Sequence, residues 1–441
     1  FVVALLSTLI FGRFFCGWAC HVVAYQDASA WLLAKLGMKP KPVRARYLVY
    51  VPLAVAIYMF VWPSVERLFV EKEPIVFQEH FTTTDFWATF SGPWIALLTL
   101  FVCGGLLIWF MGAKGFCTYG CPYGAFFGIA DRAAPGRIRV TDACEGCGHC
   151  TAVCTSNVRV HEEVKAFGQV VDAGCMKCMD CVSVCPKDAL YFGFGTVGSA
   201  NSLMQSRGKV QALPKKRYDF ELWEEGFALV VGFAAMWSFR GAYDKVPFFL
   251  AIGLGVIAAI CALTLVRTFQ QASLRLQRYD VKRSGKLTTF GLTALPLFVL
   301  FLAFTGHSGL VKWHTKAGNT ALELASQSEP RSEARKVAVA EAESALLRAE
   351  KLGLFPVAVL QQQLGEIAQS KGEMAEAKRR MEKSLSIDPD RMSVRWWLHG
   401  LLLRDARMEI GPAMQNPNWQ QAKKGLAASR AITLQALEQL R

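Results

Sequence analysis

Twelve of the fourteen cysteines in this sequence fall into regularly spaced motifs. Eight of them form two tandem runs with the spacing C-x2-C-x2-C-x3-C: Cys144, Cys147, Cys150 and Cys154, then Cys175, Cys178, Cys181 and Cys185. In runs of this kind three closely spaced thiolates wrap one iron–sulfur cluster, and the fourth cysteine reaches the neighbouring cluster. The spacing therefore predicts two [4Fe–4S] clusters.

The crosswise rule assigns a set of ligands to each predicted cluster. Cluster 1 takes Cys144, Cys147, Cys150 and Cys185, and cluster 2 takes Cys175, Cys178, Cys181 and Cys154. Cys-x2-Cys pairs also bind zinc, but the duplicated run favours iron–sulfur. The first run is followed by Thr155 where proline is usual, which changes a local turn and no ligand.

Four further cysteines form two Cys-x3-Cys pairs, which we call the membrane-edge cysteines because each pair follows an apolar run: Cys16 and Cys20, and Cys117 and Cys121. On a helix, this spacing places both thiols of a pair on one face. Two such pairs can supply four soft ligands to Cu(I) or to an iron–sulfur cluster, or act as reversible dithiols. The alternative is buried cysteines without a chemical role. We predict a further metal or redox-thiol site here.

Long apolar stretches must position these motifs. The chain has 441 residues, of which 53% are hydrophobic and 19% charged, and its mean hydropathy is +0.26. A membrane-spanning helix needs about 20 apolar residues. The predicted spans are residues 1–11, 47–63, 93–112, 226–239, 248–266 and 288–306. Phe1 lies inside an apolar run, so we expect an upstream part, and Cys103 and Cys261 lie within spans and are expected to pack there.

The formal net charge of +14 is unevenly distributed along the chain. Basic residues gather in the loops 35–46, 114–217 and 267–286, whereas the loop 64–92 is predominantly acidic. The positive-inside rule places the basic loops in the cytoplasm, which is reducing and disfavours disulfides. We therefore predict a multi-pass protein of the bacterial inner membrane, with cytoplasmic clusters, a periplasmic C-terminal tail and no nucleic-acid partner.

The predicted fold is mostly α: a polytopic helical membrane protein with an inserted bacterial-type 2[4Fe–4S] ferredoxin domain, itself small α+β, and an α-helical C-terminal domain. The predicted domains are membrane helices with both Cys-x3-Cys pairs at 1–136, the ferredoxin domain at 137–195, three further membrane helices at 196–311 and an extracytoplasmic helical domain at 312–441. The sequence has no P-loop, dinucleotide fingerprint or catalytic triad. We expect an electron carrier or redox subunit rather than a stand-alone catalyst.

The C-terminal tail is polar and rich in alanine. Residues 358–390 fit a tetratricopeptide repeat (TPR), with Gly372 at the turn, Ala377 at a close contact between helices and Pro389 at the end. The alternative is a generic helical hairpin. Repeat surfaces of this kind bind proteins, so the TPR-like tail predicts a protein partner.

The sequence from Gly12 to Cys20, the sequence from Cys117 to Gly124 and the double ferredoxin run together resemble the membrane polyferredoxins of the NapH/NosR type, with the CcoG (FixG/RdxA) proteins as relatives. The resemblance covers roughly residues 1–195. In the family, proline usually follows the second cysteine of each pair, but here His21 follows Cys20, which is either a changed ligand or a lost turn former. His307 and His314 follow the last predicted span, and we expect them to be interfacial rather than metal or haem ligands.

The resemblance implies electron transfer coupled to the quinone pool, serving a periplasmic reductase or its maturation. NosR-type relatives carry an extracytoplasmic flavin domain ahead of their spans, so FMN is expected only in an upstream part. We therefore predict a membrane iron–sulfur protein that relays electrons between quinone and a redox protein partner. One alternative is a copper-reducing assembly factor of the CcoG type, although those relatives end in a β-sandwich. The other is a membrane scaffold that docks a partner through the TPR-like tail.

Overall fold

The computed structural model describes residues 2–71, 92–156, 158–196, 218–329 and 332–415, with residues 424, 427, 431 and 432. Most of the predicted acidic loop and the basic residues of 197–217 lie outside these ranges. The described chain is mostly helical with two small antiparallel sheets, so the predicted fold class is confirmed. It divides into two compact units, one formed by residues 1–240 and 247–305, and the other by residues 241–246 and 306–441.

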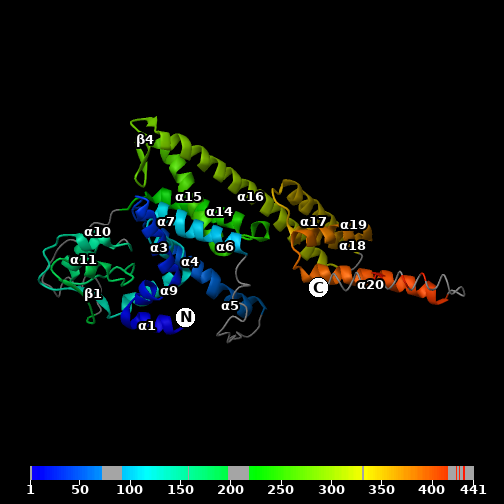
Figure 1. Cartoon of the computed structure of the whole chain (residues 1–441), viewed down its shortest axis with the longest axis horizontal. Helices are drawn as coiled ribbons and strands as arrows, with labels where there is room; N and C mark the ends of the chain where they lie inside the picture. Colours follow the sequence, from blue (N-terminus) through cyan, green and yellow to red (C-terminus); the bar gives the residue numbers. More distant parts are fainter. Residues whose placement is uncertain are drawn as a thin grey trace. The chain divides into compact units, whose positions relative to one another are not determined.

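The first unit contains short helices before the ferredoxin segment and longer ones after it (Figure 1). The helices that precede the ferredoxin segment are α1 (Val2–Phe11), α2 (Phe14–Trp18), α3 (His21–Lys35), η1 (Leu48–Tyr50), α4 (Val51–Ala56), η2 (Ile57–Val61), α5 (Trp62–Glu66), η3 (Arg67–Glu71), α6 (Pro93–Leu100), η5 (Phe101–Leu106), α7 (Leu107–Met111), α8 (Gly115–Tyr119) and α9 (Pro122–Ala133). After it come α14 (Leu222–Phe239), η6 (Ala242–Asp244), which lies in the second unit, α15 (Phe248–Gln270) and α16 (Thr289–Gln327).

Within the part of the chain that the structure describes, three helical segments are long and apolar enough to cross a membrane. They are Pro93–Met111, Phe248–Gln270 and Thr289–Gln327, and Leu48–Val61 is a shorter apolar helix. A helix suits a lipid environment because it satisfies its backbone hydrogen bonds internally. These segments indicate membrane association, while the count of six spans and their orientation remain predictions.

The helices α14 and α15 pack closely and antiparallel. A Cβ added to Gly255 would lie 2.6 Å from the carbonyl oxygen of Gly232, so the two backbones approach where both residues are glycine. At the other end of the contact, Arg267 Nη2 lies 2.5 Å from Glu224 Oε2. The pairing explains how α14 retains a charged residue in its first turn.

The ferredoxin segment is a small α+β domain. Strands β1 (Arg137–Val140) and β2 (Leu190–Gly193) pair antiparallel, with Arg137 opposite Gly193 and Val140 opposite Leu190. Its helices are α10 (His149–Val153), α11 (Val160–Phe167) and α12 (Asp180–Ser183). A buried core that includes Ile138, Val164 and Val170 also contains three cysteines of the double run. The domain therefore builds its core and its predicted ligand sites from the same residues.

A second antiparallel sheet, with three strands, follows α15. The sequence pattern did not predict this sheet. Its strands are β3 (Leu274–Leu276), β4 (Tyr279–Arg283) and β5 (Lys286–Leu287). Gln277, in the first turn, accepts a hydrogen bond from the backbone N–H of Lys41 at 2.7 Å and donates to the carbonyl of Phe110 at 2.8 Å. The sheet is thereby attached to segments more than one hundred residues earlier in the chain.

The second unit consists of helices packed as successive hairpins. After the C-terminal part of α16 come α17 (Glu333–Leu352), α18 (Ala358–Lys371), α19 (Met374–Ile387) and α20 (Met392–Gln415). Gly372 ends α18 with φ +85°, and Ala377 is fully buried against α18. The helices and turn lie where a TPR would place them, but the assignment as a TPR remains a prediction. The predicted domain boundary at residue 311 falls inside α16.

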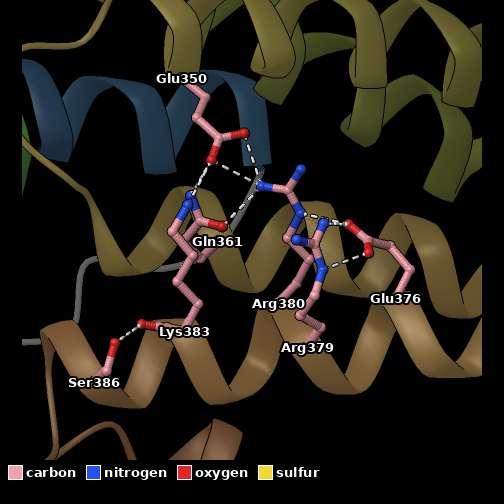
Figure 2. Close-up of polar contacts among 7 residues, drawn as sticks. All are labelled: Glu350, Gln361, Glu376, Arg379, Arg380, Lys383 and Ser386. Atoms are coloured by element: carbon pink, nitrogen blue, oxygen red, sulfur yellow. Dashed lines mark hydrogen bonds and ion pairs between the residues drawn. The ribbon is translucent and has the colours of Figure 1, made fainter.

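A charged network joins three helices of this unit (Figure 2). Glu350 of α17 accepts hydrogen bonds from Arg380 and Lys383 of α19 at 2.7 and 2.9 Å, and from Gln361 of α18 at 2.8 Å. Arg380 also bonds Glu376 one turn earlier, at 2.9 Å. Burial by itself raises the pKa of Glu350, but these hydrogen bonds and the charge of Arg380 outweigh it and lower the pKa to about 2.

Replacing Glu350 with glutamine is expected to destabilise the protein at pH 7 but much less near pH 3. The folded-state pKa lies below the ordinary value of 4.5, so the contribution is complete above pH 4.5 and is lost as the pH falls towards about 2. Because the Glu350 side chain is 24% exposed, solvent screening limits this contribution to about 1–2 kcal/mol. Thermal unfolding of both proteins from pH 3 to 7 measures it. Glu333→Gln, at an 83% exposed side chain, should change little at any pH; an unchanged E350Q difference at pH 3 would contradict the assignment.

Candidate metal centres

The eight cysteines of the double run surround two cavities. One is lined by Cys144, Cys147, Cys150 and Cys185. The other is lined by Cys154, Cys175, Cys178 and Cys181. Each cavity therefore has the three closely spaced cysteines of one run and the last cysteine of the other. Four thiolates around one cavity fit the four corners of a [4Fe–4S] cluster.

Left-handed backbone conformations shape both ligand loops. In the first loop Gly146 and Gly148 have φ of +71° and +81°, and Gly148 is the N-cap of the helix α10 that carries Cys150. In the second loop the same two positions hold Lys177 and Met179, with φ of +53° and +71°. A left-handed conformation costs a residue other than glycine roughly 1–2 kcal/mol. The second loop is thus held in its shape by contacts outside itself.

The two cavities differ in their surroundings. Residues 141–147 beside the first cavity are exposed, and the ion pair there joins two exposed side chains, Lys187 and Glu145, at 3.0 Å. At the second cavity Cys175 and Cys181 are buried. Burial raises the pKa of Cys154 to about 11 and that of Cys181 to about 12. Metal binding at the second cavity must therefore displace protons from buried thiols.

The two membrane-edge pairs have the same local structure, although not the one expected. Cys16 and Cys117 lie in the five-residue helices α2 and α8, whereas Cys20 and Cys121 precede the next helices, α3 and α9, with φ/ψ of −81°/114° and −81°/112°. The prediction that each pair lies on one helix is wrong. The helix α2 ends with a hydrogen bond from the N–H of Cys20 to the carbonyl of Phe15 at 3.1 Å. The helix α8 ends in the same way, with a hydrogen bond from the N–H of Cys121 to the carbonyl of Phe116 at 2.9 Å, as helices often do.

The structure brings the two pairs together. Cys16 and Cys117 share a buried cluster with Met176, and Cys20 packs against it. Cys121 lies near enough to Cys16 and Cys20 for their charges to interact. Burial raises the pKa of Cys117 to about 12, opposed by a hydrogen bond of 2.9 Å from Gln26 Nε2 to its sulfur. Among the described residues, no three Cys, His, Asp or Glu side chains are placed to hold a single metal ion.

The first membrane-edge pair lies directly against the second ferredoxin loop. Trp18 Nε1 donates to the carbonyl of Lys177 at 3.0 Å, and Arg13 Nη1 donates to that of Ala173 at 3.0 Å. Gly17 approaches so closely that an added Cβ would lie 2.4 Å from the carbonyl oxygen of Met176. The membrane-edge cysteines therefore adjoin the second cavity.

Sequence inspection missed the buried cations of this region. Arg13 and Lys114 each lie three residues before the first cysteine of a membrane-edge pair, and both side chains are buried. Lys177 lies between two predicted ligands of cluster 2 and is also buried. The repeated position of Arg13 and Lys114 is a signal that the sequence alone offered.

The remaining candidate residues lie apart from these centres or at their margin. His21 takes the first position of α3, where Pro122 stands in α9, and its side chain is exposed. Cys103 contacts the carbonyl of Phe249 at 3.5 Å, and Cys261 is buried within α15. His307 and His314 lie within α16.

Family models match the segments that contain these cysteines. A model described as a 4Fe-4S binding domain matches residues 1–39 and 94–141, which include all four membrane-edge cysteines. A model described as a 4Fe-4S dicluster domain matches residues 143–190, which include all eight cysteines of the double run. These matches support iron–sulfur clusters as the cofactors.

Curated relatives match less than half of the chain. An uncharacterized protein of Methanocaldococcus jannaschii is 29% identical over 201 residues, which are 44% of this chain and 77% of that protein. The methylamine utilization ferredoxin-type protein MauN of Methylobacillus flagellatus is 31% identical over 157 residues, 35% of this chain and 52% of MauN. The ferredoxin-type protein NapH of Haemophilus influenzae is 27% identical over 203 residues, 43% of this chain and 66% of NapH. No solved structure shows significant similarity to the chain.

Proposed function

We propose, starting from the fact that residues 1–190 form a NapH-type polyferredoxin, that this chain relays electrons between the quinone pool and a redox protein partner. Iron–sulfur electron transfer is the part that the relatives' names and the family models support directly. The quinone, the partner and the direction of flow belong to the proposal.

The observation that carries this function is the crosswise arrangement of eight thiols around two cavities. We assign Cys144, Cys147, Cys150 and Cys185 to cluster 1, and Cys154, Cys175, Cys178 and Cys181 to cluster 2. When bound, each cluster supplies a reversible one-electron carrier. The chain contributes the thiolates, hydrogen bonds such as that from the Ala189 N–H to Cys185 Sγ at 3.3 Å, and, around cluster 2, the exclusion of water.

The proposed orientation follows from charge. The basic residues of the three-stranded sheet, Arg275, Arg278, Lys282, Arg283 and Lys286, follow the apolar helix α15, and excess positive charge beside spans marks the cytoplasmic side. On this basis we propose that the ferredoxin domain lies in the cytoplasm and the helical tail in the periplasm of a bacterial inner membrane. The tail is then available to a periplasmic protein partner.

Quinol reduction of the purified protein tests the relay. Full-length protein purified anaerobically in detergent should hold about eight iron atoms in the double run, and a water-soluble quinol should reduce them, as followed by EPR. In the proposed relay the membrane-edge thiols pass electrons from quinol to cluster 2 as a dithiol/disulfide couple, which takes up and releases two electrons and two protons. Replacing the four membrane-edge cysteines with serine should therefore slow reduction by quinol at least about tenfold. Dithionite should still reduce the clusters. Absence of iron would overturn the electron-carrier function, and unaltered quinol reduction would overturn the role of the thiols.

A second function is favoured by the gathering of four thiols at the membrane edge, of which those of Cys16 and Cys117 are buried. Soft thiolates bind Cu(I) well, and the neighbouring clusters would supply the electron that reduces Cu(II) to Cu(I). In that case the same fourfold serine variant should lose Cu(I) binding, measured by competition with a colorimetric Cu(I) chelator. Unchanged binding would rule the copper function out.

A further inference from the structure

We propose that Lys177, paired with Asp131, sets the reduction potential of cluster 2 above that of cluster 1 and makes cluster 2 the site of electron exchange with the membrane-edge cysteines. This rests on the proposed function in requiring both clusters to be present. It goes further by naming the residues that order them.

Lys177 occupies a position where its backbone would favour glycine. The corresponding residue of the first ligand loop is Gly146, and both have positive φ. A residue other than glycine is strained in this left-handed conformation, yet this position holds a lysine whose side chain is only 2% exposed. Strain of this kind persists where surrounding contacts hold the residue in place. The contacts of the Lys177 ammonium group identify what holds the lysine in this conformation.

The ammonium of Lys177 is held between the ligand loop and α9. Its Nζ lies 2.8 Å from Asp131 Oδ1 and 3.3 Å from the carbonyl of Cys175. The same carboxylate oxygen accepts the backbone N–H of Arg13 at 2.8 Å. Gly12, with φ of +72°, leaves room for the pair, because an added Cβ would lie 2.6 Å from Asp131 Oδ1 and 2.7 Å from Lys177 Cε. The pair therefore joins cluster 2 to the first membrane-edge segment.

Buried cations outnumber buried carboxylates here. Lys177, Arg13 and Lys114 are buried, and Asp131 is the buried carboxylate among their contacts. Lys114 Nζ has no hydrogen-bond partner among the described residues and lies 3.6 Å from Asp27 Oδ2, whose side chain is 46% exposed. A buried charge whose ion-pair partner is a half-exposed carboxylate, with no hydrogen bond of its own, is incompletely compensated and therefore costly. An anionic cluster beside these cations would balance the charge, so the surroundings fit the group.

The same excess of cations orders the two potentials. Reduction adds one electron and no proton, so a nearby buried cation favours the reduced form. Beside cluster 2 the Lys177 side chain is 2% exposed, whereas the carboxylate that contacts Cys178 Sγ at 3.2 Å, Asp180, is partly exposed and more strongly screened by water. The cation beside cluster 1, Lys187, is 53% exposed and is likewise screened. An electron that enters at the membrane edge therefore reaches cluster 2, the cluster with the higher reduction potential, first. In this proposal cluster 1, next to the exposed residues 141–147, exchanges electrons with the redox protein partner.

Redox titration of two charge variants with opposite expected signs tests the proposal. In Lys177→Gln the Asp131 charge is left unbalanced, so the ratio of reduced to oxidised cluster 2 at the wild-type midpoint should fall at least about tenfold. In Asp131→Asn the Lys177 charge is left unbalanced, and the ratio should rise by a similar factor. EPR-monitored titration of anaerobic full-length protein measures both, and cluster 1 should not shift.

Matched variants separate charge from damage. Lys177→Gly, which copies Gly146 and relieves the positive φ, should shift cluster 2 in the same direction as Lys177→Gln even if the glutamine variant folds poorly, and Lys177→Arg should restore the wild-type potential. Lys187→Gln, at the exposed cation of cluster 1, should shift neither cluster. Shifts of one sign in both K177Q and D131N, or no shift with full iron content, would overturn the proposal and leave the electron-carrier function standing. Loss of all iron in the wild type would overturn that function instead.

Discussion

Cys154→Ser is expected to remove cluster 2 and leave cluster 1, although Cys154 belongs to the first cysteine run. Cys154 lines the same cavity as Cys175, Cys178 and Cys181, and a serine hydroxyl is a poor replacement for a cluster thiolate. Cys185→Ser should do the reverse, because Cys185 lines the cavity of the first run. Each variant should retain about four of the eight iron atoms, and EPR of the reduced protein should show one isolated spin system.

Comparing serine variants from the two cysteine runs decides whether the crosswise assignment holds. Cys154→Ser should give the same spectrum as Cys178→Ser and a different spectrum from Cys150→Ser. Cys261→Ser, at a buried cysteine of α15 outside both cavities, should keep all the iron. If Cys154→Ser and Cys150→Ser lose the same cluster, each run holds its own cluster and the crosswise assignment is wrong.

Gly17→Thr is expected to separate the membrane edge from the ferredoxin loop. Any Cβ at residue 17 would lie 2.4 Å from the carbonyl oxygen of Met176, so one backbone must move. Overpacking of this kind costs about 1–3 kcal/mol. The displaced Met176 lies between two predicted ligands of cluster 2, Cys175 and Cys178. We expect a lower temperature of cluster loss, followed by visible absorbance, and slower reduction by quinol.

The chain itself supplies the controls for this substitution. Thr118 stands at the position of Gly17 in the other membrane-edge pair, so the local fold of a pair tolerates threonine and the expected damage comes from the contact with Met176. Gly226→Thr, at a glycine with nothing within 4 Å of an added Cβ, should leave both measurements unchanged. A fully stable Gly17→Thr protein would show that the close approach is not needed.

Local spacing made the cofactor and the fold class predictable. Cys144, Cys147 and Cys150, each three residues apart, can reach one cluster whatever surrounds them. Predominantly apolar runs such as Phe248–Gln270 form helices because lipid excludes unpaired backbone groups. The mostly helical fold with a small ferredoxin domain followed from these two patterns. The three-stranded sheet at 274–287 did not, because its strands are short and polar and depend on a turn held by distant backbone groups.

By itself the sequence determined which chemistry this protein carries, since ligand spacing is a property of ten or so neighbouring residues. Only the tertiary structure decided how the centres are connected and charged. The contact of Trp18 with Lys177 spans 159 residues, and the pair of Lys177 with Asp131 spans 46. No local pattern encodes such contacts, because they arise when separate helices bury their polar groups against one another and each buried charge must find a partner.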